Sequence, residues 1–425
     1  MHALGAILGL AAAATLIAGL GASGAASGSA FAATEPAAST SAPAAPAATA
    51  PAAPAATATA SAAAAVRPAE SPTPTTADAK ALAERRKAAI AKGADFLLKS
   101  QAEDGSWMKA NVGISALCTD ALLTAGKTLK DPAVKRAVEF LLKFQKDDGG
   151  IYDDSGLDNY TTSIAVMVLT KADAAAYSKQ VAKAIAFLTE HQWGATESID
   201  DKDPRYGGAG YGKQKRPDMS NTQFFVEALR AADVPKDNPA WAKVVVFISR
   251  SQARSESNDL KGITHQDDSG FFYTPAGEGE SKADYVDLPN GKKGLRSYGS
   301  MTYAGFKSFI YARLEPNDPR VKAALDWIRK HWTFQENPEI GQQGLYYYYQ
   351  TAAKALKAYS EVSKEPRITD ARSRPHDWRA EITEALLAKQ QGDGSWFNET
   401  DRWFEGKEIA PVPTSYAVIA LTNCQ

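Results

Sequence analysis

Two five-residue segments contain the side chains whose types and spacing are best suited to chemistry. They are residues 158–162 (DNYTT) and 218–222 (DMSNT), and each has an aspartate four residues before a threonine that opens an apolar helical pattern. An aspartate at such a place can transfer a proton. It can also cap the helix by accepting backbone N–H bonds and complementing the helix dipole. We predict capping for Asp158 and Asp218, and we keep Asp218 as the one candidate catalytic acid.

The elements that must position these segments are repeated helical hairpins. Six copies of a segment with apolar residues at helical spacing recur along the chain, five of them ending in glutamine, at residues 96–101, 140–145, 187–192, 247–252 and 386–391, and one at 327–332. Several copies run into a glycine turn followed by an aromatic residue, at 104–107, 148–152, 269–273 and 393–396. Helical spacing followed by a glycine turn predicts the first helix of a hairpin and its end.

A second helix follows each turn, and five of these helices share one register. A serine or threonine is followed seven residues later by leucine or phenylalanine, beginning at Ser115, Thr162, Thr222, Thr302 and Thr414. Five residues after these positions stand Asp120, Glu227 and Lys307. They allow either a buried polar network or partly solvated contacts between helices, and we favour the latter. Repeats one and six lack the polar surface that ends an open solenoid, so the sequence predicts a closed ring.

One motif carries a resemblance to a known family. Glutamine followed at short distance by Asp-Gly-Ser-Trp, at residues 101–107 and 391–396, resembles the QW motif of squalene and hopene cyclases. The resemblance covers about four fifths of the chain and implies an all-α fold, the α6/α6 toroid shared with protein prenyltransferases. It also implies that the glutamine and tryptophan tie neighbouring repeats together, and that inner helix ends line a central cavity.

The sequence departs from this family at the catalytic acid. Squalene-hopene cyclases protonate an alkene with the middle aspartate of a DxDDT motif, and the matching position here is Ser220. A hydroxyl is too weak an acid to protonate an isolated double bond. The preceding repeat offers only Tyr160 at this place. The resemblance therefore implies a toroid that binds an isoprenoid or another apolar molecule, and any enzymatic activity would be of the terpene cyclase or isomerase type.

Ten residues are expected to line the cavity, and they are rich in tyrosine. Aromatic faces suit polyisoprenoid chains and also stack on sugars, although some of the rings are expected simply to fill the core. Besides the candidate acid Asp218, the predicted ligand-binding residues are Tyr160, Met219, Ser220, Asn221, Tyr298, Met301, Tyr347, Tyr348 and Tyr416.

Two other classes of function remain open. In a carbohydrate-active lyase or hydrolase, Tyr160 and Asn221 would form a proton-transferring pair. A noncatalytic scaffold would use the ring to hold a protein partner.

Neither a metal nor an organic cofactor is predicted. The chain lacks a glycine-rich phosphate loop, and a zinc site would have to use Cys118 or Cys424. Residues 265–268 (HQDD) resemble a metal loop, but a structural turn is favoured because Asp268 begins a copy of the glycine turn. The two cysteines either form a disulfide between the first and last repeats or stay as unpaired thiols.

The sequence of the first 80 residues predicts an exported protein. Residues 1–32 join an apolar run to Ala30-Phe31-Ala32, which is typical of a secretory signal, whereas the absence of lysine and arginine there leaves an uncleaved membrane anchor open. Residues 33–80, rich in Ala, Pro, Thr and Ser, predict a disordered linker, followed by the toroid at 81–425. We expect a secreted, periplasmic or cell-envelope protein. With 48 basic and 49 acidic side chains, nucleic acid is not an expected partner; the oligomeric state is not indicated.

Overall fold

The computed structural model describes residues 76–425 apart from 109–110, 195–198, 214 and 402. The predicted signal and nearly all of the predicted linker lie outside these residues; the first described helix begins at Thr76, inside the segment assigned to the linker. The described residues form twelve α-helices, one short 3-10 helix (η1, Lys407–Ile409) and four very short strands. The all-α class is confirmed.

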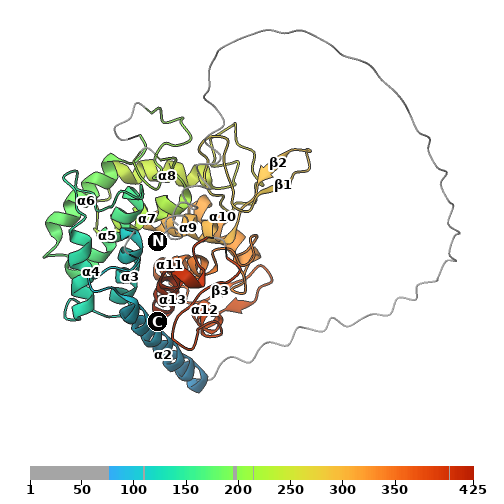
Figure 1. Ribbon diagram of the computed structural model, residues 1–425. Helices are drawn as coiled ribbons and strands as arrows, with labels where there is room; N and C mark the ends of the chain where they lie inside the picture. The colour runs from blue at the N-terminus through green and yellow to red at the C-terminus, as the bar shows by residue number, and fades with distance from the viewer. Residues whose placement is uncertain (1–75, 109–110, 195–198, 214, 402) are drawn as a thin grey trace, which may run out of the picture. The chain divides into compact units, whose positions relative to one another are not determined.

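Six helices form an inner layer. Each contacts the next in chain order, and the last contacts the first, so that the layer closes on itself (Figure 1). This confirms the predicted toroid. The inner helices are α3 (Val112–Thr124), α5 (Asp158–Asp173), α7 (Met219–Ala231), α9 (Gly299–Tyr311), α11 (Leu345–Ser363) and α13 (Pro411–Asn423).

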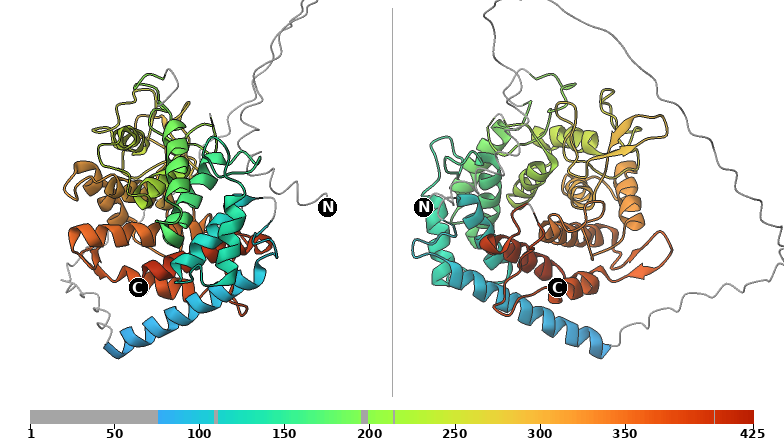
Figure 2. Two further views of the ribbon diagram at one scale, coloured as in Figure 1. Left: turned by 90° about the vertical axis from the view of Figure 1, so that its left-hand side faces the viewer. Right: turned by 45° about the vertical axis from the view of Figure 1, so that its right-hand side comes forward.

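The other six helices pack outside this layer. The first of them packs against both α13 and α3, and Figure 2 shows the red end of the chain beside its blue beginning. None of the described helices is long and apolar enough to cross a membrane. The outer helices are α2 (Thr76–Ser100), α4 (Pro132–Leu142), α6 (Ser178–Glu190), α8 (Pro239–Ser251), α10 (Pro319–Lys330) and α12 (Trp378–Leu387).

The short strands form two antiparallel ribbons in the loops between helices. Strand β1 (Tyr285–Asp287) pairs with β2 (Lys293–Leu295), and β3 (Ile368–Thr369) pairs with β4 (Pro375–His376).

The shared serine or threonine of the inner helices has a common structural role. In α7, the Thr222 hydroxyl accepts a hydrogen bond from the backbone N–H of Ala209 at 3.0 Å. The equivalent hydroxyls accept from the first residues after the other turns, in the pairs Ser115–Trp107, Thr162–Ile151, Thr302–Phe271 and Thr414–Trp396. Each bond fixes the beginning of an inner helix against its own turn, which explains why the five helices share a register.

Glutamine side chains join successive repeats. Gln101 donates from Nε2 to the Gly105 carbonyl in its own turn and to the Ala133 carbonyl in the next outer helix, at 3.0 and 2.9 Å. Gln145, Gln192 and Gln252 make the same pair of bonds in their repeats. In the last repeat the bonding residue is Gln390, whereas the sequence pattern pointed to Gln391. Gln390 donates to the Ala89 carbonyl of α2, joining the last repeat to the first.

Both cysteines are buried and unpaired. Burial raises the pKa of Cys118 and of Cys424 to about 12, so both thiols are protonated at neutral pH. Of the two alternatives left open by the sequence, unpaired thiols are confirmed.

Candidate functional site

Four aromatic side chains meet at the centre of the inner layer, and we call them the hub cluster. The ring centroids of Tyr160 and Phe224 are 5.1 Å apart, those of Phe224 and Tyr347 6.4 Å, and those of Tyr347 and Tyr416 5.8 Å. The hydroxyls of Tyr416 and Tyr160 interact and complete the circuit. These residues come from α5, α7, α11 and α13. Since α7 and α11 are separated by α9 in the contact order, the cluster lies inside the ring.

The hub cluster is only partly closed. Tyr160 and Tyr347 are half-buried, whereas Tyr416 is 8% exposed and Phe224 2%. Tyr211, in the loop before α7, lies with its ring centroid 6.4 Å from that of Tyr160, tilted by 45°, and is 37% exposed. The arrangement therefore presents an aromatic surface that can contact an apolar ligand.

Asp218 is the N-cap residue of α7, as predicted. Its Oδ1 accepts the backbone N–H of Asn221 at 2.9 Å and its Oδ2 accepts the side-chain amide of Asn221 at 2.7 Å. Burial raises the pKa of Asp218 to about 6, although the Asn221 amide and the Tyr273 hydroxyl oppose the shift. The Asp218 carboxyl thus forms hydrogen bonds at the beginning of α7, and it is a weaker acid than an exposed aspartate.

Asp158 does not repeat this arrangement, and its predicted capping role is wrong. The N-cap position of α5 is Leu157, and no side chain caps it; Asp158 is the first helical residue. Its Oδ2 instead accepts the backbone N–H of Lys213 at 3.4 Å. The same spacing in sequence gives different contacts because the helix starts one residue earlier relative to the aspartate.

Ser220 begins a chain of hydrogen bonds that runs along the inside of the ring. Its Oγ lies 3.1 Å from the Tyr347 hydroxyl, and Gln223 donates from Nε2 to the same hydroxyl at 2.6 Å. Gln223 Oε1 in turn accepts a bond from the Lys307 ammonium. We call Lys307, Gln223, Tyr347 and Ser220 the polar chain.

The polar chain ends in three buried charges, the ion triad of Glu227, Lys307 and Lys354. The Glu227 carboxylate bonds the ammonium groups of Lys307 and, at 2.7 Å, Lys354. Despite its burial, the two ammonium groups lower the pKa of Glu227 to about 2. Burial lowers the pKa of Lys307 to about 8. All three groups are therefore charged at neutral pH.

The ion triad corrects one interpretation of the sequence. Partly solvated contacts were favoured for Asp120, Glu227 and Lys307, but Lys307 is 0% exposed and Glu227 5%. Glu227 and Lys307 form a buried network instead, because the third turns of α7, α9 and α11 converge inside the ring. Asp120 is buried as well, but its ion pair is with the Lys171 ammonium at 2.7 Å.

Another buried carboxyl, Glu405, lies at the N-terminus of α11. Its Oε1 accepts the backbone N–H of Tyr347 at 2.8 Å, and its Oε2 has no hydrogen-bond partner among the described residues. Burial and the nearby Asp401 raise the pKa of Glu405 to about 8. Glu405 is therefore mainly protonated at pH 7, next to the backbone of a hub residue.

The remaining predicted residues lie at varying distances from the hub cluster. Met219, Met301 and Tyr298 are buried; burial raises the pKa of Tyr298 well above its ordinary value, and the nearby Tyr347 and Asp218 add to the shift. Tyr348 points elsewhere: its hydroxyl donates to the Thr333 carbonyl at 2.7 Å and its ring contacts Tyr303. No hydrogen bond joins Tyr160 to Asn221 in the described part of the chain, and the Asn221 side-chain amide donates to Asp218.

Sequence reasoning missed Phe224, Gln223, Lys354 and Glu405. Gln223 and Phe224 follow Thr222, the shared threonine of α7, by one and two residues. A helical wheel anchored on Thr222 would have placed them near Ser220. Lys354 lies in α11, whose register differs from that of the other inner helices. Glu405 lies in a loop, where the sequence offers no periodic signal.

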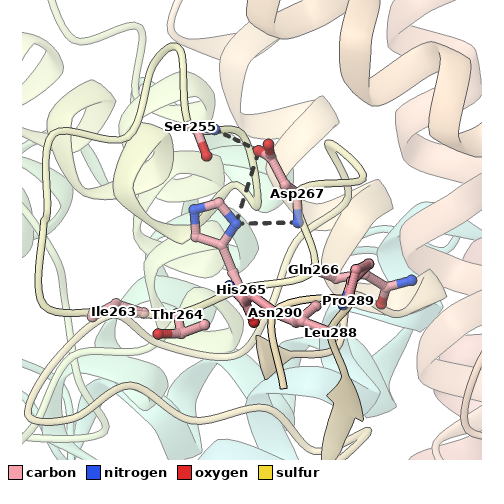
Figure 3. A pocket seen from close by; sticks show the side chains of 9 residues that line it. All are labelled: Ser255, Ile263, Thr264, His265, Gln266, Asp267, Leu288, Pro289 and Asn290. Carbon is pink, nitrogen blue, oxygen red and sulfur yellow. Dashed lines mark hydrogen bonds and ion pairs between the residues drawn. The ribbon is translucent and has the colours of Figure 1, made fainter. Parts of the chain in front are cut away.

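Two pockets are found away from the hub, and neither includes a predicted ligand residue. One, lined by nine residues between Ser255 and Asn290, is an open groove of about 400 Å³ (Figure 3). In it His265 accepts the Asp267 backbone N–H on Nδ1 at 3.2 Å. Asp268 bonds Ser297 and Trp327 at 2.6 and 2.7 Å, which confirms that residues 265–268 form a structural turn. The other pocket, of about 430 Å³, lies between α10 and the end of α11.

The fold and this site define the class of an α/α toroid with an aromatic centre. Residues 108–274 match the family model of the squalene-hopene cyclase C-terminal domain. This match confirms the resemblance to squalene-hopene cyclases that the sequence motifs indicated. No curated protein sequence matches the chain.

Solved structures agree on the fold. Substrate-free type II terpene cyclase MstE from Scytonema is 14% identical, with 80% of this chain and 98% of MstE covered and a TM-score of 0.50. An MstE variant in complex with geranylgeranyl dihydroxybenzoate is 12% identical, covering 81% and 99%, with a TM-score of 0.52. A D-mannose isomerase is 12% identical, covering 83% and 99%, also at 0.52. At this identity the likeness shows the fold alone, which hosts several chemistries.

Proposed function

We propose that this protein binds an isoprenoid or another long apolar molecule against the hub cluster. The observation that carries the proposal is the circuit of Tyr160, Phe224, Tyr347 and Tyr416, which joins helices from opposite sides of the ring and leaves two rings half-buried. Aromatic faces bind extended alkenes through dispersion and burial of apolar area. A type II terpene cyclase with the same fold has been crystallised with a prenylated substrate, which supports this class of ligand.

Protonation of an isolated alkene is not part of the proposed activity. Ser220 stands where the family's acid is expected, and the Asp218 carboxyl accepts two hydrogen bonds at the helix end. The substitution Ser220→Asp restores an aspartate at the expected acid position. We expect wild-type protein to return squalene unchanged in gas chromatography with mass spectrometry. Cyclic products from the wild type would overturn this part of the proposal, and Ser220→Asp is the variant in which new products would appear.

Ligand binding is tested first by extraction. Purified protein is extracted with organic solvent, and the extract is analysed by mass spectrometry for isoprenoids. Delipidated protein is then titrated with geranylgeraniol by calorimetry. We expect Tyr416→Leu to weaken binding about 5–10-fold, because one aromatic contact of about 1 kcal/mol is lost. The matched control Tyr285→Leu changes a ring that is 52% exposed in β1, and it should bind like wild type. Absence of both retained lipid and geranylgeraniol binding would overturn the proposal.

Export belongs to the same proposal. The apolar run and Ala30-Phe31-Ala32 support cleavage after Ala32 and a secreted, periplasmic or envelope location. Intact mass measurement of protein expressed with its own N-terminus tests this. A mature chain beginning at Ala33 supports cleavage, and a full-length chain in the membrane fraction supports an uncleaved anchor.

A further inference from the structure

The polar chain has a direction that follows from hydrogen-bond chemistry. The Lys307 ammonium can only donate, so Gln223 must present Oε1 to it, and the amide orientation is thereby fixed. Gln223 then presents its Nε2 donor to the Tyr347 oxygen at 2.6 Å. Lys307 has a pKa of about 8 and is protonated at pH 7, so this direction holds under ordinary conditions.

The bond between Tyr347 and Ser220 brings the chain to the hub. Their oxygens lie 3.1 Å apart and either hydroxyl can donate, since a phenol oxygen that accepts from Gln223 keeps a second lone pair. When Tyr347 donates, the Ser220 hydrogen has no acceptor in the described part of the chain. Ser220 is half-buried at the beginning of α7, so its hydroxyl stays within reach of a ligand.

The ion triad holds this arrangement in place. Gln223 and Lys307 are both 0% exposed, and the Glu227 carboxylate fixes the Lys307 ammonium from the other side. A chain whose donors and acceptors are set from a buried charge does not easily reverse, since each member would lose its partner. The part of the chain from Lys307 through Gln223 to the Tyr347 oxygen is therefore fixed, and a ligand acceptor at Ser220 favours the arrangement in which Tyr347 donates to Ser220.

We propose that Ser220 donates a hydrogen bond to an oxygen acceptor on the head group of the bound molecule, so that the ligand is an oxygenated isoprenoid and not a pure hydrocarbon. This inference rests on the proposed function, because it names the ligand class of the same hub. Alcohols, ethers, esters and carboxylates supply the acceptor, whereas a hydrocarbon supplies none.

The test compares head groups on one chain length. Delipidated protein is titrated with geranylgeranyl methyl ether and with the matching hydrocarbon that lacks the oxygen, at pH 7. We expect the ether to bind about 5–10-fold more tightly than the hydrocarbon, the effect of one hydrogen bond between neutral groups.

Variants then identify the donor. Ser220→Ala should abolish the preference for the ether over the hydrocarbon. Tyr347→Phe keeps the ring but frees the Ser220 hydroxyl to rotate, so the preference should fall in part. Ser178→Ala, at the exposed start of α6, is the matched control and should keep the full preference.

The outcomes separate the two proposals. If hydrocarbon and ether bind equally well and Ser220→Ala changes neither, the head-group inference is wrong and the hub proposal stands. If neither ligand binds wild-type protein that folds normally by circular dichroism, the hub proposal itself fails. A preference that survives Ser220→Ala also overturns the inference, since another donor must then supply it.

Discussion

The two ends of the polar chain differ in how completely their hydrogen bonds are satisfied. At the deep end, Lys307 and Lys354 both pair with Glu227, and each of the three is less than one tenth exposed. At the hub end, Ser220 and Tyr347 are half-buried and the last hydrogen of the chain has no acceptor within the described residues. A closed charge network suits a structural element, whereas an open donor suits a ligand. The difference indicates that stability is concentrated at the deep end and binding at the hub end.

The largest expected effect is at the deep end. Glu227→Gln leaves the Lys307 and Lys354 ammonium groups buried without a counter-charge, and removing one member of a buried ion pair costs about 3–5 kcal/mol. Urea unfolding followed by circular dichroism measures the loss. The control is Glu384→Gln, which breaks an exposed pair with Arg85 and should cost less than about 1 kcal/mol. Equal losses in the two variants would show that the deep end carries no special share of stability.

A pH titration sharpens the comparison at the hub end. Because burial raises the pKa of Asp218 from 3.8 to about 6, the folded state holds its proton more tightly than the unfolded state. This contribution to stability is complete below about pH 3.8 and is lost as pH rises through about 6.

Asp218→Asn should remove that part of the pH dependence while keeping the cap, since asparagine also caps helices. We expect the variant to gain about 1–3 kcal/mol relative to wild type between pH 4 and pH 7, at about 1.4 kcal/mol per pKa unit. Unfolding free energies measured across that range decide the matter. Parallel curves for the two proteins would mean that Asp218 is solvated and not part of a desolvated hub.

Closure of the ring between the last and first repeats stabilises both ends of the polar chain. Substitutions of two neighbouring glutamines test how this closure is made. Gln390→Ala removes the bonds to the Ala89 and Gly394 carbonyls, and two lost hydrogen bonds should cost about 1–2 kcal/mol. Gln391→Ala removes only a bond to the Lys389 carbonyl at an exposed position, so a change below about 0.5 kcal/mol is expected. Thermal unfolding of both variants gives the comparison. The reverse order of effects would contradict the closing role assigned to Gln390.

The fold was predictable from local patterns because the interactions that define each helical hairpin lie within that hairpin. Helical spacing, the glycine turn and the shared serine or threonine all act within a single hairpin, and the Thr222 hydroxyl bonds a residue only thirteen positions away. Asp218 as a cap was predictable for the same reason. Asp158 was not, because the start of α5 is set by contacts with the loop before α7, including the Tyr211 carbonyl that accepts from Asn159.

The hub was only partly predictable because its contacts span the ring. Ser220 and Tyr347 are 127 positions apart, and Lys354 and Glu227 are equally distant. Which faces of α7 and α11 meet depends on the curvature contributed by every intervening repeat. Sequence periodicity identified the helix ends that carry Tyr160, Ser220, Tyr347 and Tyr416. It could not show that Gln223 of α7 bonds Tyr347 of α11, or that the Tyr348 side chain points away from the hub.

The smallest expected effect is the most direct check of the open end. Ser220→Ala removes a hydroxyl whose one hydrogen bond lies at a half-buried position where water can replace it, so stability should change by less than about 0.5 kcal/mol. Thr222→Val, two residues along α7, removes a fully buried hydroxyl that serves the Ala209 backbone and should cost about 1–2 kcal/mol. Both are measured by urea unfolding. If Ser220→Ala costs as much as Thr222→Val, Ser220 belongs to the folded framework and its hydroxyl is not free to serve a ligand.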